Sequence, residues 1–166
     1  SGRVEQSSYI NNFDNTTVLS LSFDNDNGNT VRDDSYYGNN GVLANGPTLI
    51  SNCISGKCYN LDGLDDYIVF STSNTLDPLD HDFTAEVWIK TGSSTTGNIF
   101  NKFDAGNGWL VSINPFGGVG ELRVLFGNGV NSINAQRGSN LNDDQWHYIA
   151  IVFDYGDNII VYIDGA

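Results

Sequence analysis

Two apolar runs near the end of the chain, Tyr148–Phe153 and Ile159–Ile163, flank a short polar break that contains Gly156. Both runs are rich in β-branched and aromatic residues, and such runs on either side of an Asp/Gly/Asn break are typical of a β-hairpin. Successive side chains of a strand point to opposite faces, and here neither face of either run is polar. We therefore expect a hairpin that is covered on both sides, at the centre of a layered β structure.

The composition fits an all-β domain and excludes some partners. The 166 residues are enough for one substantial core, and nine Phe, eight Tyr and three Trp supply large apolar side chains. The net charge of −13 repels phosphate backbones and anionic lipid surfaces, so we expect no nucleic-acid partner. No apolar run approaches the roughly 20 residues of a membrane helix, so no membrane insertion is expected.

Short apolar segments follow one another at the spacing of an antiparallel sandwich. Residues 1–17 are polar and aperiodic, and we interpret them as a leader or linker before one domain at 18–166. The connection Ser71–Asp82 has room for a single helical turn. The predicted strands before the hairpin are Val18–Phe23, Gly41–Leu43, Thr48–Ile50, Cys58–Leu61, Asp66–Phe70, Phe83–Lys90, Asn98–Phe103, Gly108–Ile113, Glu121–Phe126 and Val130–Ala135.

The two cysteines, Cys53 and Cys58, are close together in the sequence. A zinc site would need two further ligands, and the two histidines, His81 and His147, are distant and isolated. A disulfide that closes a small loop is the favoured interpretation, and free buried thiols are the alternative. A disulfide implies an oxidising compartment, so we expect a secreted or cell-surface protein.

A series of short motifs occurs in one order along the chain: Leu21–Asp24, Tyr37–Gly41, Ser55–Lys57, Leu61–Ile68, Phe83–Lys90, Gln145–Ala150 and Tyr162–Gly165. In this order they resemble the laminin-G-like domains of the concanavalin A-like lectin/glucanase superfamily. The resemblance covers about residues 18–166 and implies an antiparallel jelly-roll β-sandwich.

The resemblance also implies that C-terminal strands are missing. Domains of the family continue beyond the turn at Asp164-Gly165 with strands that cover the first strand, and this chain stops at Ala166. We therefore expect Val18–Phe23 to have an open edge. A segment of a longer precursor or a strand from a neighbouring subunit would fill it. The alternative is that the chain is an excised fragment of an ordinary domain.

An enzymatic function is not expected. Glycosidases on this fold carry paired carboxylates on one strand face, which would appear as acidic residues at i, i+2 or i+4. Glu86 is alone on its predicted strand. Asp65 and Asp66 are adjacent and therefore point apart, and the acidic pair at 143–144 lies in a predicted turn.

Two loops that flank the first predicted strand are dense in the oxygen ligands that calcium prefers. Related domains often hold one structural calcium near such loops, so the resemblance supports a calcium site here. A solvated acidic loop, in which Asp and Asn side chains cap turns, is the alternative. The candidate ligands are Asp24, Asp26, Asp34 and Asn39, and Asp33 and Asn40 lie in the same loops.

Sugars stack on exposed aromatic rings that have amide and carboxylate groups nearby. The candidates for this role lie beside Gly or Asn, where loops would present them, although packing at the rim of the core is the alternative. Trp88 and Trp146, inside apolar strands, are expected in the core. The loop candidates are Tyr36, Tyr37, Trp109 and Phe116.

Together these features predict a non-catalytic extracellular binding or adhesion module. Its favoured ligand is a glycan, and a cell-surface protein is a further candidate partner. The alternative function is a building block of a cell-surface layer or filament, completed by a strand from another segment or subunit.

Overall fold

The computed structural model describes residues 15–77, 81–138, 140–154 and 158–166. Within these ranges the chain is built of antiparallel strands with two short 3₁₀ turns, so the predicted all-β class is confirmed. Contacts divide the chain into an N-terminal unit, Ser1–Leu76, and a C-terminal unit, Asp77–Ala166. The predicted leader falls mostly on residues 1–14, outside the described residues, and its boundary with the domain stays a prediction.

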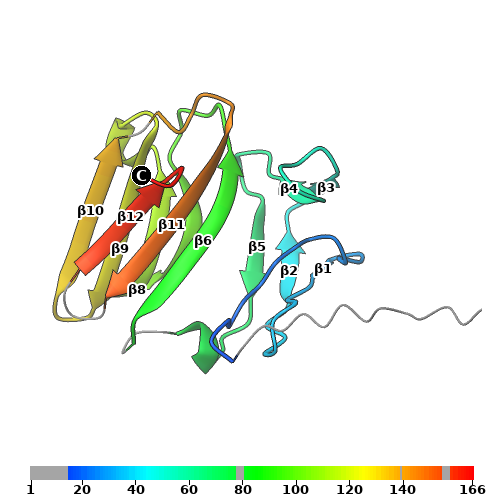
Figure 1. Ribbon diagram of the computed structural model, residues 1–166, viewed down its shortest axis with the longest axis horizontal. Helices are drawn as coiled ribbons and strands as arrows, with labels where there is room; N and C mark the ends of the chain where they lie inside the picture. The colour runs from blue at the N-terminus through cyan, green and yellow to red at the C-terminus, as the bar shows by residue number, and fades with distance from the viewer. Residues whose placement is uncertain (1–14, 78–80, 139, 155–157) are drawn as a thin grey trace, which may run out of the picture. The chain divides into compact units, whose positions relative to one another are not determined.

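The N-terminal unit holds two small sheets of short strands (Figure 1). The turn predicted within Ser71–Asp82 is confirmed as the 3₁₀ turn η1 (Asn74–Leu76). One sheet has the order β1-β2-β5 and the other pairs β3 with β4; their bounds are β1 (Thr30–Val31), β2 (Gly41–Ala44), β3 (Thr48–Ile50), β4 (Cys58–Asn60) and β5 (Tyr67–Phe70).

The prediction of a first strand at Val18–Phe23 is wrong, because these residues are not part of a described sheet. The Ser20 N–H donates to the Asp33 carboxylate, and the Ser20 carbonyl accepts from the Asp34 N–H, both at 2.8 Å. Phe23 has a φ of 61°, which ends any extended run. The segment therefore bonds to a loop, and the strand edge expected there is absent from the described structure.

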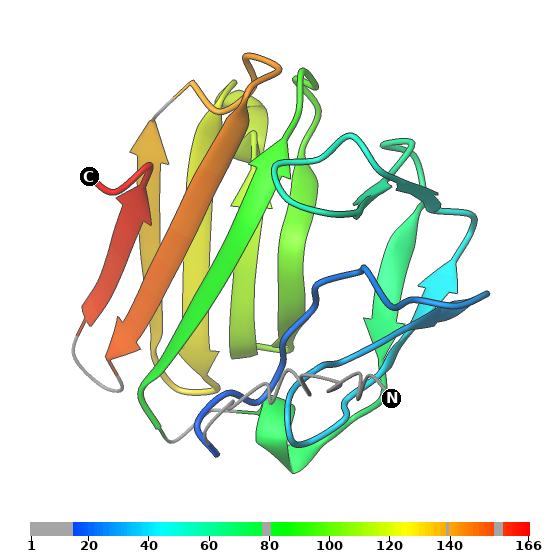
Figure 2. The same cartoon turned by 45° about the vertical axis from the view of Figure 1, so that its right-hand side comes forward.

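The C-terminal unit contains two larger antiparallel sheets, which Figure 2 shows as two layers. The 3₁₀ turn η2 (Pro115–Gly117) connects β8 to β9. One sheet has the order β10-β9-β8-β7 and the other β12-β11-β6; their bounds are β6 (Phe83–Lys90), β7 (Gly97–Asp104), β8 (Asn107–Ile113), β9 (Glu121–Asn128), β10 (Ser132–Gly138), β11 (Trp146–Asp154) and β12 (Asn158–Ile163).

The core of this unit lies between the two sheets. Val111 and Leu122 from one sheet and Ile149 and Ile151 from the other belong to one buried cluster. Burial of each such side chain stabilises the fold by roughly 1.5–3 kcal/mol. The predicted sandwich is therefore confirmed for this unit.

The predicted hairpin is confirmed as β11 and β12, with Ile149 opposite Ile163. The expectation that the second strand is covered on both faces and lies inside the sandwich is wrong. β12 pairs only with β11 and is an edge strand. Its residue Ile160 is 45% exposed, and Tyr162 on the same face is also exposed.

Trp88 is not in the core as predicted, because it is 46% exposed. Phe83, Ala85, Val87 and Ile89 of β6 pack against the core, so alternation turns Trp88 outward. There its ring lies 5.2 Å from that of Tyr148. Trp146, also predicted to be in the core, is half-buried and pairs with Lys90 at the end of β6.

Candidate functional site

The turn between β8 and β9 presents Phe116 at the surface. Phe116 is 82% exposed, and its φ of 51° lies in the left-handed region that bulky residues rarely adopt. A backbone held in such a region costs roughly 1–3 kcal/mol and persists only where surrounding contacts impose it. The position of this ring is therefore set by the loop around it.

Asn114 supplies the contacts that hold the loop. Its side chain is fully buried, and its Nδ2 donates to the carbonyls of Ser93 and Thr95, both at 2.8 Å. Its Oδ1 accepts from the Gly120 N–H at 2.7 Å, which closes the far end of the loop. Asn tolerates the φ of 54° found here better than most residues do. The base of the loop is thus rigid before any ligand arrives.

Arg123 on β9 lies against the exposed ring. Its guanidinium carbon is 4.8 Å from the centroid of Phe116, within the range of a cation–π contact. Its Nε donates to Oδ1 of Asn134 on β10 at 3.1 Å, which fixes the direction of the guanidinium. Among the described residues, Arg123 has no carboxylate at ion-pair distance.

A carboxylate and a further amide lie on the same sheet face. Gln136 is opposite Arg123 in the register of β10 and β9, and Glu121 precedes Arg123 by two residues on one strand face. The Gln136 amide donates to the Glu121 carboxylate. Arg123 lies against the ring, and the carboxylate and amides on the same strand face offer further groups that sugar hydroxyls can bond. The Phe116 platform is the set Phe116, Glu121, Arg123, Asn134 and Gln136.

The other aromatic candidates lie elsewhere. Tyr36 and Tyr37 belong to the N-terminal unit, where their rings meet edge to face at 5.7 Å. The Tyr37 hydroxyl donates to the Asn15 carbonyl at 2.9 Å. Trp109 lies within β8, inside the predicted strand Gly108–Ile113, and packs against Phe83 and Phe100 at the core, so no loop presents it at the surface.

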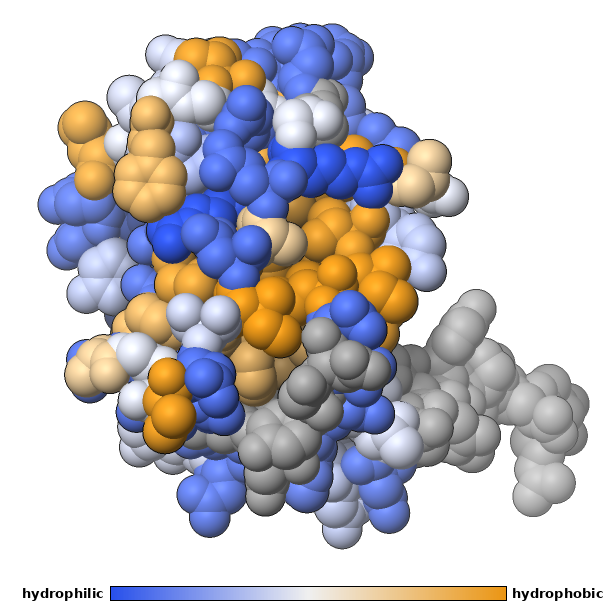
Figure 3. All heavy atoms as spheres, turned by 90° about the vertical axis from the view of Figure 1, so that its left-hand side faces the viewer, coloured by the Kyte–Doolittle hydropathy of each residue, from blue (hydrophilic) through white to orange (hydrophobic). Residues whose placement is uncertain are grey.

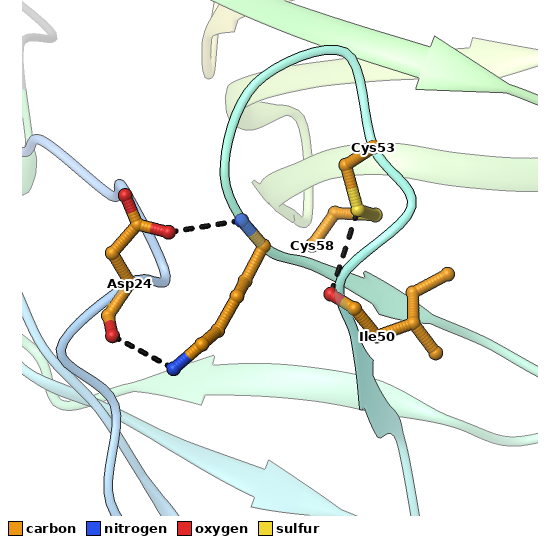
Figure 4. Close-up of a disulfide and its surroundings, with 5 residues drawn as sticks. Asp24, Ile50, Cys53 and Cys58 are labelled. Atoms are coloured by element: carbon orange, nitrogen blue, oxygen red, sulfur yellow. Dashed lines mark hydrogen bonds between the residues drawn. A yellow bond between two sulfur atoms is a disulfide. The ribbon is translucent and has the colours of Figure 1, made fainter.

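The predicted calcium ligand Asp24 is bonded to the disulfide loop (Figure 4). Its carboxylate accepts from the Lys57 N–H at 2.9 Å, and its carbonyl accepts from Lys57 Nζ at 3.0 Å. Lys57 immediately precedes Cys58, and the predicted disulfide between Cys53 and Cys58 is present. Asp24 therefore ties the N-terminal segment to this loop.

The remaining predicted ligands also bond to protein groups. Asp26 accepts from the Arg32 N–H at 2.7 Å. Asp34 accepts from the Ser22 hydroxyl at 2.6 Å and lies 3.2 Å from Nε of Arg32. The Asn39 amide donates to two neighbouring oxygens of the same unit. The calcium site stays a prediction, and an ion would compete with these donors.

Asp33 organises the same loops from a buried position. Its carboxylate accepts from the backbone of Ser20, Ser35 and Asn39 and from the Ser35 hydroxyl, at 2.7–2.9 Å. Burial opposes ionisation, but these hydrogen bonds outweigh it and hold the pKa of Asp33 below its usual value. This carboxylate is therefore a structural anchor of the loops.

Asp62, Asp65 and Asp66 have carboxylate oxygens within 4.8 Å of one another, and they form the one such acidic group among the described residues. Asp62 accepts from the Leu64 N–H at 2.8 Å, and Asp66 accepts from the Asp62 N–H at 2.9 Å. Such bonds are typical of Asp side chains that cap a tight turn. The group is explained by the turn alone.

Comparison with known proteins decides the family. A laminin-G-type family model, described as the concanavalin A-like lectin/glucanases superfamily, matches residues 62–166. The chain belongs to this superfamily. No curated protein matched this superfamily member. No helix in the described ranges is long and apolar enough to cross a membrane.

Two solved structures share the fold of this superfamily member at low sequence identity. The crystal structure of the binding domain of Paraclostridial Mosquitocidal Protein 1 aligns with a TM-score of 0.70 and 16% identity over 88% of this chain. The crystal structure of a mutant of HCR/D aligns with a TM-score of 0.62 and 19% identity over 89% of this chain. The alignments span 38% and 36% of those two chains, respectively.

Proposed function

We propose that this superfamily member is a non-catalytic extracellular binding module that binds a glycan through the Phe116 platform. The observation that carries the proposal is an exposed aromatic ring fixed by a buried, fully bonded asparagine. A ring held in advance loses little conformational entropy when a sugar stacks on it. The guanidinium beside it, with the carboxylate and amides on the same strand face, would bond the hydroxyls.

Two further observations support this role. The Cys53–Cys58 disulfide fits an oxidising compartment and so an extracellular setting. The first of the two similar structures is titled a binding domain. We extend that property to this chain as part of the proposal.

A glycan array probed with the purified chain tests the proposal. We expect reproducible binding, and we expect Phe116→Ala to abolish it without lowering the melting temperature, because the ring is exposed and makes few packing contacts. Tyr36→Ala is the matched control, since it removes another exposed aromatic from the N-terminal unit, and it should keep binding. An array without hits would instead favour the surface-layer building block.

A further inference from the structure

Arg123 carries a positive charge that has no carboxylate at ion-pair distance among the described residues, although the chain is strongly acidic. Acidic residues outnumber basic ones by 20 to seven. Three other basic side chains each have a carboxylate at 3.2–3.8 Å: Arg32 with Asp34, Lys90 with Asp144 and Lys102 with Asp77. In a chain with so many carboxylates, an uncompensated guanidinium beside an exposed ring favours an anionic group of a ligand as its partner.

The guanidinium is held in one direction, and its two terminal nitrogens have no hydrogen-bond partner within the described ranges. Its Nε donates to Oδ1 of Asn134 at 3.1 Å, and its carbon lies 4.8 Å from the centroid of Phe116. The parallel N–H groups of a guanidinium match the oxygens of a carboxylate or of a similar anionic group. Nη1 and Nη2 of Arg123 can therefore accommodate an anionic group of a sugar that is bound at the ring.

The sheet face around Arg123 carries little negative charge. The register of β7, β8, β9 and β10 leaves Glu121 as the one acidic residue on this face within these four strands. The other side chains on the face are uncharged and include Asn98, Asn101, Leu110, Ser112, Leu125 and Gln136. Charges more than about 8 Å away are largely screened at physiological salt, so the groups on this face decide whether it accepts an anion.

Glu121 is already bonded within the protein. Its carboxylate accepts from the Gln136 amide and lies so close to Gly118 that a Cβ at that position would collide with it. The carboxylate therefore lies against the loop that carries Phe116. It forms no ion pair with Arg123, so the charge of the guanidinium stays uncompensated on this face.

We infer that the Phe116 platform prefers sugars that carry a carboxylate or a sulfate group, and that Arg123 determines this preference. The sugar ring stacks on Phe116, and its anionic group accepts from the terminal nitrogens of Arg123. The inference rests on the glycan binding proposed above and adds the chemical class of the glycan. The net charge of −13 opposes extended polyanions, whereas a short oligosaccharide brings its charge to a face with one carboxylate.

An array that holds neutral, carboxylated and sulfated oligosaccharides tests the preference. We expect anionic hits that bind roughly tenfold or more tightly than their neutral counterparts, which are the methyl ester of a carboxylated hit and the desulfated form of a sulfated one. Equal binding of the anionic and neutral forms overturns this inference but leaves the proposed function in place. An array without hits, or hits that Phe116→Ala does not weaken, contradicts both.

Variants of Arg123 assign the preference to its guanidinium. Arg123→Gln should reduce binding of the anionic hit to the level of its neutral counterpart. Arg123→Lys keeps the charge but not the planar fork, so it should recover part of the preference. A preference that Arg123→Gln leaves unchanged overturns the inference. The comparison of anionic and neutral forms uses the wild-type chain, so it holds even if a variant fails to fold.

Arg137→Gln is the matched control, because it removes the same charge from the adjacent strand β10. Nη1 of Arg137 donates to the Val161 carbonyl at 2.7 Å, and the side chain lines an apolar groove of about 330 Å³. Figure 3 shows the apolar patch on this side of the molecule. Arg137→Gln should keep the preference for anionic sugars, and an equal loss in the two variants would show that Arg123 does not determine it.

Discussion

Nδ1 of His147 lies 2.8 Å from the carboxylate of Asp164, and its Nε2 lies 3.0 Å from that of Asp143. Asp164 also accepts from the Tyr148 N–H at 2.9 Å. Together, the bonds from His147 and Tyr148 hold Asp164, in the turn that follows β12, against the start of β11. The bond to Asp164, supported by Asp143, raises the pKa of His147 despite its burial. The same bonds lower the pKa of both carboxyl groups.

This clamp makes stability depend on pH in a defined direction. The pKa of His147 is raised above its ordinary 6.5, so its contribution is complete below that value and is lost as pH rises through the raised pKa. The acids behave oppositely: their contribution is present above the ordinary Asp value of 3.8 and is lost as pH falls through their lowered pKa values. The clamp therefore stabilises the fold most between these limits.

Melting curves across pH check the clamp. We expect the melting temperature to fall as pH rises above neutrality and His147→Gln to flatten that fall. An unchanged slope in His147→Gln would contradict the assignment.

Asn114 should be among the residues most sensitive to substitution in the C-terminal unit. Asn114→Ala leaves the carbonyls of Ser93 and Thr95 and the Gly120 N–H without their partner. The Gly120 N–H is buried, and an unsatisfied buried group costs about 1–3 kcal/mol, whereas Ser93 and Thr95 are exposed and their carbonyls can bond water. We therefore expect a loss of about 1–3 kcal/mol in unfolding free energy. Chemical denaturation measures it. Asn114→Gly separates backbone strain from the loss of the side-chain hydrogen bonds, because glycine accepts the positive φ but also lacks the amide.

The disulfide should stabilise the protein only modestly. It joins residues five positions apart, and short loops gain less than the roughly 2–4 kcal/mol typical of native bridges. We expect Cys53→Ser with Cys58→Ser to lower the denaturation midpoint slightly. Mass spectrometry of the native, non-reduced protein should find no thiol that reacts with an alkylating agent. Two reactive thiols would also remove the main support for an extracellular setting.

Strand positions could be predicted because they depend on local patterns. The alternating run Phe83–Lys90 matches β6 at both ends, and Thr48–Ile50 matches β3. Val18–Phe23 has the same kind of pattern but is not a strand, because Asp33 and Asp34 bond its backbone. The Asp33 carboxylate competes with strand pairing for the Ser20 N–H, and because Asp33 is thirteen residues away in sequence, nothing within Val18–Phe23 indicates this.

Which face of a strand is buried could not be predicted where both faces are apolar. Ile160 is exposed because Ile159 and Val161 pack against the core, and only the pairing of the sheets decides which of these two apolar faces does so. Trp88 could have been placed from the sequence, because Thr84, Glu86 and Lys90 share its strand face and are polar, so alternation already directs that face to solvent. The Phe116 platform could not be predicted from the sequence either, because it depends on how two strands pair. Phe116 stood out as a loop aromatic, but Arg123 and Asn134 come together through the register of β9 and β10, which the sequence does not specify.

The predicted calcium site can be tested by melting curves, and the hydrogen bonds of the loops show which variants are informative. If an ion binds there, adding millimolar calcium after EDTA treatment should raise the melting temperature, by the equivalent of about 2.7 kcal/mol at a hundredfold excess over Kd. Asp24→Ala is a poor test on its own, because losing the bonds to Lys57 destabilises the chain with or without calcium. Asp34→Asn keeps the size of the side chain and should remove the calcium-dependent shift, whereas Asp65→Asn should keep it. If the shift instead survives Asp34→Asn and disappears in Asp65→Asn, the ion binds at the Asp62 turn and the ligands assigned from the sequence are wrong.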